Sequence, residues 1–175
     1  MAGSASHGPT PEHIFETLNA HQRTAALKAA VELDLFTAID EGNHRVPEIA
    51  KRLNASERGV RILCDFLTVL GFLAKEGFAY KLTPDSALFL SKRSPAYMGT
   101  IVEFLTNPQH FENLALLTET VRKGRTTYSR GSNLEPNDEL WVSFARSMAP
   151  LTRPTALFIA DLLRAAGRGP GECLI

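Results

Sequence analysis

The side chains best suited to hold a ligand lie close together near residue 145, where their spacing predicts one helical face. Leu140, Phe144 and Met148 recur every four residues, and Trp141 lies beside them. Aromatic rings and thioether sulfur pack well against ring systems, so this face could wall a pocket for a flat aromatic molecule. Apolar side chains at the same spacing also form ordinary helix core. Both interpretations remain open at this point.

A second group of candidates surrounds a predicted helix start. Asn107 precedes a proline, Phe104 lies three residues before it and Phe111 four residues after it. The side-chain oxygen of Asn107 can cap the helix or contact a ligand. The two phenylalanines can line a pocket or fill the core. The sequence therefore predicts Asn107 and Phe111 as further substrate contacts, with capping and core packing as the alternatives.

Residues 124–137 lack periodicity and are rich in turn-forming residues, which predicts a long loop. Long ordered loops often carry function. Tyr128 and Arg130 in this loop could close over a bound substrate as a lid. A solvated loop is the alternative.

The groups that bind metals or cofactors form no recognisable cluster. Cys64 and Cys173 match no ligand spacing. Three glycines within residues 167–171 precede an apolar stretch, whereas a nucleotide-binding fingerprint follows a strand. The sequence thus predicts no metal site and no cofactor site in this chain.

Composition narrows the function classes. Acidic and basic residues balance at a formal net charge of zero, so no whole-molecule field attracts nucleic acid or anionic lipid. No apolar run approaches the roughly 18 residues of a membrane span. Residues 1–9 have no apolar segment of the kind a signal peptide needs, and we expect them to form a disordered tail. The expected location is the cytoplasm, without a membrane partner.

The elements that position the candidates are mostly helices. A capping residue followed by proline predicts helix starts at four places, which are Thr10-Pro11, Thr83-Pro84, Ser94-Pro95 and Asn107-Pro108. The first apolar face contains Ile14, Phe15 and Leu18, and an alanine-rich face over residues 25–33 is assigned to a second helix. Together with residues 35–39 these faces exceed what two helices can bury against each other. A partner chain is therefore expected.

The middle of the chain predicts a winged helix. Residues 46–53 form one helix, closed by Asn54, and a second helix runs from Ser56 to Gly71. Residues 72–74 and 78–82 then flank a turn containing Gly77, whose glycine can take a positive φ, which predicts a short β-hairpin. Beyond this wing, helices are expected near residues 84–90, 95–105, 108–123, 138–148 and 157–166, with Pro150 and Pro154 kinking or dividing the helical stretch between the last two.

The order of these elements, together with several local strings, resembles one known family. The strings are Ala29-Ala30-Val31-Glu32-Leu33-Asp34-Leu35-Phe36, Pro47-Glu48-Ile49-Ala50, Phe66-Leu67-Thr68-Val69-Leu70-Gly71-Phe72-Leu73, Tyr80-Lys81-Leu82-Thr83 and Phe144-Ala145-Arg146-Ser147-Met148. They are similar to the amino-terminal dimerisation domain of plant-type and bacterial S-adenosylmethionine (SAM)-dependent small-molecule O-methyltransferases, the hydroxyindole and caffeate-type enzymes. The resemblance spans nearly the whole chain.

The resemblance implies a mainly α fold, a winged helix-turn-helix with extra helices, in an intertwined homodimer. It divides the chain into a tail (1–9), a winged-helix dimerisation domain (10–90), substrate-lid helices (91–167) and the start of a Rossmann-like SAM domain (168–175). In that family the helix bearing the Phe-x-x-x-Met spacing borders the acceptor pocket, which matches Phe144 and Met148 here. The glycine-rich SAM motif and the general-base histidine belong to the later domain, so no histidine of this chain is assigned to catalysis.

The predicted function is therefore the dimerisation and substrate-pocket part of a SAM-dependent O-methyltransferase that acts on a small phenolic or similar hydroxyl. SAM is the cofactor of the full-length family, and this chain alone is expected to bind none and to be inactive. Two alternatives remain, a DNA-binding winged-helix regulator and a stand-alone dimerisation module. Residues 46–82 carry six basic and four acidic side chains, a thin surplus against the roughly 6–10 phosphate contacts of a duplex binder. Nucleic acid is thus the less favoured partner.

Overall fold

The structure is a computed structural model that describes residues 9–125 and 139–165. Helices dominate these residues, and two short strands form an antiparallel hairpin. The elements in chain order are α1 (Glu12–Glu32), α2 (Leu35–Asp40), α3 (Val46–Leu53), α4 (Glu57–Val69), β1 (Leu73–Glu76), β2 (Ala79–Leu82), α5 (Pro84–Phe89), α6 (Gly99–Leu105), α7 (Pro108–Ala115), α8 (Leu117–Lys123) and α9 (Glu139–Ala165).

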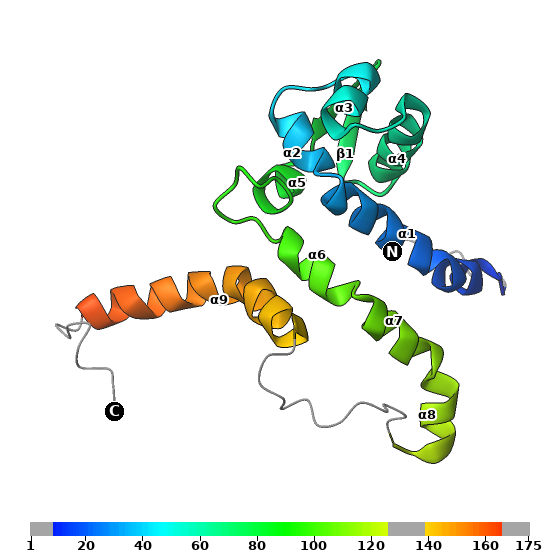
Figure 1. The fold of residues 1–175 in the computed structure, drawn as a ribbon, viewed down its shortest axis with the longest axis vertical. Helices are drawn as coiled ribbons and strands as arrows, with labels where there is room; N and C mark the ends of the chain where they lie inside the picture. The colour runs from blue at the N-terminus through cyan, green and yellow to red at the C-terminus, as the bar shows by residue number, and fades with distance from the viewer. Residues whose placement is uncertain (1–8, 126–138, 166–175) are drawn as a thin grey trace, which may run out of the picture.

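Helices α2, α3 and α4 and the β1–β2 hairpin gather into one body (Figure 1). In the hairpin Leu73 pairs with Leu82 and Glu76 with Ala79. The core below it is continuous and draws on α1, α2, α3, α4 and both strands, with the buried side chains Ala30, Leu35, Phe36, Ile39, Ile49, Val60, Cys64, Leu67, Leu73 and Tyr80. The predicted winged helix-turn-helix, mainly α with a short β-hairpin wing, is confirmed.

Local signals set the ends of α3. The Glu48 carboxylate accepts hydrogen bonds from the backbone N–H groups of Arg45 (3.0 Å) and His44 (3.1 Å), which satisfies donors that the helix start leaves free. Both hydrogen bonds lower the pKa of Glu48, and the bond from Arg45 has the larger effect. At the other end Asn54 takes a left-handed conformation with φ 50°, which asparagine tolerates better than most residues. The helix-turn-helix therefore follows from short-range sequence.

A polar cluster holds the hairpin against α4. The Tyr80 hydroxyl donates to Asp65 Oδ1 (2.7 Å), and Lys75 Nζ contacts the same oxygen at 2.5 Å. The Lys75 ammonium also lies 5.0 Å from the centre of the Tyr80 ring. Hydrogen bonds from Lys75 and then from Tyr80 lower the pKa of Asp65, so the carboxylate stays ionised. One carboxylate thus joins both strands to the second helix of the helix-turn-helix.

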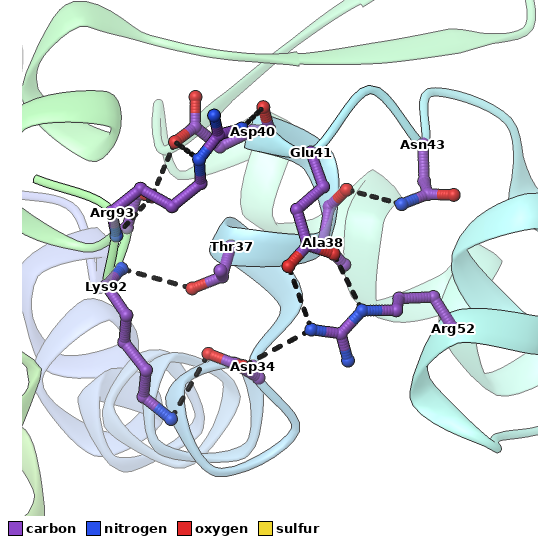
Figure 2. Close-up of polar contacts among 10 residues, drawn as sticks. Asp34, Thr37, Ala38, Asp40, Glu41, Asn43, Arg52, Lys92 and Arg93 are labelled. Atoms are coloured by element: carbon purple, nitrogen blue, oxygen red, sulfur yellow. Dashed lines mark hydrogen bonds and ion pairs between the residues drawn. The ribbon is translucent and has the colours of Figure 1, made fainter.

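A second polar cluster fixes α2 between α3 and the segment after α5 (Figure 2). Arg52 of α3 forms a two-point contact with Glu41, at 2.7 and 3.0 Å, and this hydrogen bonding lowers the pKa of Glu41. Asp34 faces Lys92 at 3.2 Å, and the Lys92 backbone N–H donates to the Thr37 hydroxyl at 3.1 Å. The two contacts of Lys92 join residues more than fifty positions apart and fix the segment after α5 against α2.

Beyond this body the chain extends as an arm. Helices α6, α7 and α8 follow one another away from the winged helix, and α9 returns to lie beside α6 (Figure 1). Helix α1 packs its carboxyl-terminal part on α2, α4 and α6, while residues 11–25 are all exposed. Among the described residues, no helix combines the length and apolar character that a membrane span requires.

Four expectations about element boundaries were wrong. Residues 12–32 form a single helix, since no proline or glycine interrupts them. Ser94-Pro95 starts a turn in which the Ser94 hydroxyl accepts the Ala96 N–H, and α6 begins only at Gly99. The stretch 108–123 divides into α7 and α8 at Leu116. The helices expected near residues 138–148 and 157–166 form the single helix α9, so Pro150 and Pro154 do not divide it.

The prediction of a side-chain cap at Thr83 also needs correction. Thr83 precedes α5, but its hydroxyl donates to the Phe72 carbonyl (3.2 Å) and contacts the Ser86 hydroxyl, without capping the helix. Most of the long loop, including Tyr128 and Arg130, lies outside the described residues. The same holds for all of the tail except residue 9 and for the whole of residues 168–175.

Candidate functional site: an aromatic cluster between α6 and α9

Three of the candidate aromatic residues meet where α9 crosses α6. The rings of Phe104 on α6 and Phe144 on α9 lie 5.4 Å apart between centres, with their planes at 61°. The Trp141 ring stands edge-on to Phe144 at 5.7 Å and 87°. These are the edge-to-face arrangements that aromatic side chains prefer. The residues come from positions about 40 apart in sequence, and the packing of two helices brings them together.

The cluster is only partly covered. Trp141 is 43% exposed and Phe144 37% exposed, whereas Met148, one turn further along α9, is half-buried. Between them Ser147 is fully buried, and its hydroxyl donates to the Phe144 carbonyl at 2.8 Å. The cluster therefore has a packed side toward α6 and an open side of aromatic edges. Such a surface can stack a flat ligand but offers no acid or base to it.

The other predicted contacts are less closely grouped. Asn107 precedes α7, and its carbonyl accepts the Phe111 N–H at 3.5 Å, so its backbone supports the helix start. Phe111 lies one turn further on and is 45% exposed. Leu140 lies in the first turn of α9, but its side chain is outside the described set, as are Tyr128 and Arg130. Substrate contact by these residues stays a prediction.

Cys64 is fully buried below the wing, and burial raises the pKa of its thiol to about 12, so it is not a nucleophile at neutral pH. Among the described residues, no set of three histidine, cysteine or carboxylate side chains could hold a metal ion.

A cavity of about 460 Å³ at the wing was missed by sequence reasoning. It lies between the start of α3, the first turns of α4 and the hairpin, with Arg45, Glu57, Arg58, Arg61, Lys75 and Phe78 among its lining residues. Arg58 and Arg61 are two of the six basic side chains of residues 46–82 that were weighed against duplex DNA. Their spacing of three residues places them on one face of a helix, and this could have indicated a basic site. That Arg45 and the hairpin lie beside this face depends on tertiary structure.

The chain matches known proteins along most of its length. Residues 15–92 match the family model of the O-methyltransferase dimerisation domain. The tetracenomycin polyketide synthesis 8-O-methyl transferase of Streptomyces glaucescens is 34% identical over 120 residues, which are 68% of this chain and 35% of that protein. A candidate O-methyltransferase from Nostoc punctiforme has a solved structure that is 43% identical, with a TM-score of 0.81, over 90% of this chain and 48% of that one.

A human structure shows the same fold at lower identity. Human N-acetylserotonin methyltransferase, solved in complex with SAM, is 24% identical with a TM-score of 0.61, over 85% of this chain and 44% of that one. The present chain thus spans less than half the length of each of these proteins. The family match covers α2, α3, α4, the hairpin, α5 and most of α1, the body described above. Residues 15–92 of this chain are therefore an O-methyltransferase dimerisation domain.

Proposed function

We propose that this chain forms the homodimerisation and acceptor-pocket part of a SAM-dependent O-methyltransferase. Residues 10–90 supply the dimerisation unit and residues 91–167 the helices that border the acceptor, while no residue of this chain is assigned to SAM or to the general base. The single observation that carries the proposal is the family match over residues 15–92. The chain by itself is then expected to be inactive.

The exposed half of α1 supports a dimer. Ile14, Phe15 and Leu18 are 61%, 58% and 63% exposed, and they lie on adjoining turns of one helix. Fully burying such a side chain gains about 1.5–3 kcal/mol, so covering these three offers roughly 1–2 kcal/mol each. An apolar face of this kind on the otherwise polar first half of α1 indicates a protein partner. A second copy of the chain is the partner that a dimerisation domain calls for.

Sedimentation tests this dimer directly. At micromolar concentration the chain should sediment at twice its 19.2 kDa mass. A double variant, Phe15→Asp and Leu18→Asp, should shift it to the monomer, because each carboxylate would have to be buried at the interface. Val69→Asp is the matched control, since Val69 is 82% exposed on α4, outside the proposed interface. A wild-type chain that sediments only as a monomer would refute the dimer.

The partly exposed aromatic cluster supports an aromatic acceptor. The open edges of Trp141 and Phe144 offer a stacking surface, and Met148 continues it along α9. The human protein of the same fold is named for a hydroxyindole derivative, N-acetylserotonin, which is a flat aromatic molecule. We therefore propose a phenolic or similar hydroxyl as the group that is methylated.

Two titrations test these roles. 1-Naphthol should shift the indole N–H resonance of Trp141, the single tryptophan of the chain, while the non-aromatic cyclohexanol should not. Phe144→Ala should weaken the naphthol effect. SAM titrated by calorimetry into the chain should give no saturable heat, because the cofactor site is proposed to lie elsewhere. Micromolar SAM binding would contradict that assignment.

A further inference from the structure

The cavity at the wing is built differently from the aromatic cluster. It is a half-open hollow with a volume of about 460 Å³, within the roughly 300–1,000 Å³ typical of small-molecule sites. Four of its lining residues are cationic, which are Arg45, Arg58, Arg61 and Lys75, and one, Glu57, is anionic. A surplus of positive charge in a concave site focuses the field on an entering anion.

Three of these cations form no ion pair among the described residues. Lys75 is held by Asp65 at 2.5 Å. The guanidinium groups of Arg45, Arg58 and Arg61 contact no carboxylate of the described part at ion-pair distance, although the charge of Arg45 helps to lower the pKa of Glu48 and that of Arg61 the pKa of Asp65. Elsewhere the same fold pairs its arginines closely, as Arg52 does with Glu41. Convergent unpaired guanidinium groups are suited to carboxylate and phosphate oxygens, which they bind through two parallel hydrogen bonds.

The hairpin adds an apolar ring to this charged cavity. Phe78, at the turn between the strands, is 86% exposed and lines the cavity. The Tyr80 ring also lines it, but its hydroxyl is already donated to Asp65. A ligand that fits both features carries a negative group for the arginines and a flat ring for Phe78. We propose that this cavity binds a small aromatic anion, a ring that bears a carboxylate or a phosphate.

Duplex DNA is the less suitable occupant. A duplex binder makes about 6–10 phosphate contacts spread along the backbone. Here three unpaired guanidinium groups converge on one cavity, and Glu57 lies among them. Lys81 of the wing is paired with Glu76 at 2.6 Å, so its charge is already partly neutralised. The arrangement matches one compact anion and not an extended strand.

Titrations monitored by amide resonances test the proposal on the 175-residue chain. Phenyl phosphate and benzoate separate the two negative groups, and phenol is the uncharged control. At least one of the anions should bind saturably, shift residues 45–47, 57–61 and 75–80, and lose affinity as ionic strength rises. Phenol should bind at least tenfold more weakly, because it lacks the charged group whose hydrogen bonds to an arginine contribute at least that factor to affinity.

Variants and a competing duplex complete the test. The double variant Arg58→Gln and Arg61→Gln should weaken binding about tenfold or more. The matched control, Arg146→Gln and Arg153→Gln, removes two exposed arginines of α9 and should leave binding unchanged. Equal affinity for phenol, no saturable binding of either anion at millimolar concentration, or an unaffected Arg58/Arg61 variant would overturn the proposal. Binding of duplex DNA in preference to both anions, with a steep salt dependence, would overturn it in favour of nucleic acid.

Discussion

Replacing Phe144 by alanine should show whether its ring holds α9 on α6. The side chain is 37% exposed, so roughly two thirds of it is buried. A fully buried phenylalanine loses about 3–5 kcal/mol on truncation to alanine, which scales here to about 2–3 kcal/mol of unfolding free energy. The edge-to-face contact with Phe104 at 5.4 Å adds a pairwise part of about 0.5–1.5 kcal/mol.

A double-mutant cycle isolates that pairwise part. Urea unfolding of the wild type, Phe104→Ala, Phe144→Ala and the double variant can be followed by the fluorescence of Trp141, which lies 5.7 Å from Phe144. The double variant should lose less than the sum of the two single losses, by the coupling given above. Val142→Ala, at a 49% exposed position on the same helix, is the control and should cost well under half as much.

Additive losses within about 0.3 kcal/mol would refute the reasoning. So would a loss below about 0.5 kcal/mol for Phe144→Ala, a cost typical of surface substitutions. In that case Phe144 would not pack on α6, and its ring would be a surface feature available only to a ligand. The expected result instead gives Phe144 two functions, with one face of the ring in the helix interface and the other exposed.

Four further outcomes follow from the winged helix. Asn54→Ala should cost about 1 kcal/mol while Asn54→Gly changes stability by less than about 0.5 kcal/mol, because φ at this position is 50°, and thermal unfolding measures both. Tyr80→Phe should cost about 1 kcal/mol in urea unfolding by removing the bond to Asp65. Hydrogen bonds from Lys75 and Tyr80 lower the native pKa of Asp65, so Asp65 contributes fully to the free energy of unfolding above its unfolded pKa. This contribution is lost as the pH falls through the lower native pKa. In urea unfolding at a series of pH values, Asp65→Asn should therefore lose less stability at acid pH than the wild type. Cys64, whose thiol pKa burial raises to about 12, should resist thiol reagents at pH 8 until the chain unfolds, as peptide mapping would show.

The winged helix could be predicted from sequence because its signals are local. Asn54 ends α3 with a left-handed residue, and Gly77 takes φ 59° in the hairpin turn, as the turn chemistry predicts. The apolar spacing of α4 places Val60, Cys64 and Leu67 in the core. Each of these features depends on residues within a few positions of one another.

The candidate site was predictable only in part. The spacing of Phe144 and Trp141 indicated a shared face, but their contact with Phe104 depends on how α9 returns past α6. The cavity at the wing likewise requires Arg45 and Arg58, on different elements, to converge. Helix α9 shows the opposite error, since Pro150 and Pro154 predicted a possible division into two helices, whereas the structure has one helix over Glu139–Ala165.

The free half of α1 has a consequence for how this protein becomes ordered. Residues 11–25 have no buried position of their own, and a helical segment of about 12–15 residues is marginal in water without support. The helical population of residues 11–25 should therefore depend on protein concentration. On dilution, amide protons in residues 12–20 should exchange with solvent well before those of α4, so that assembly and the last step of folding become the same event.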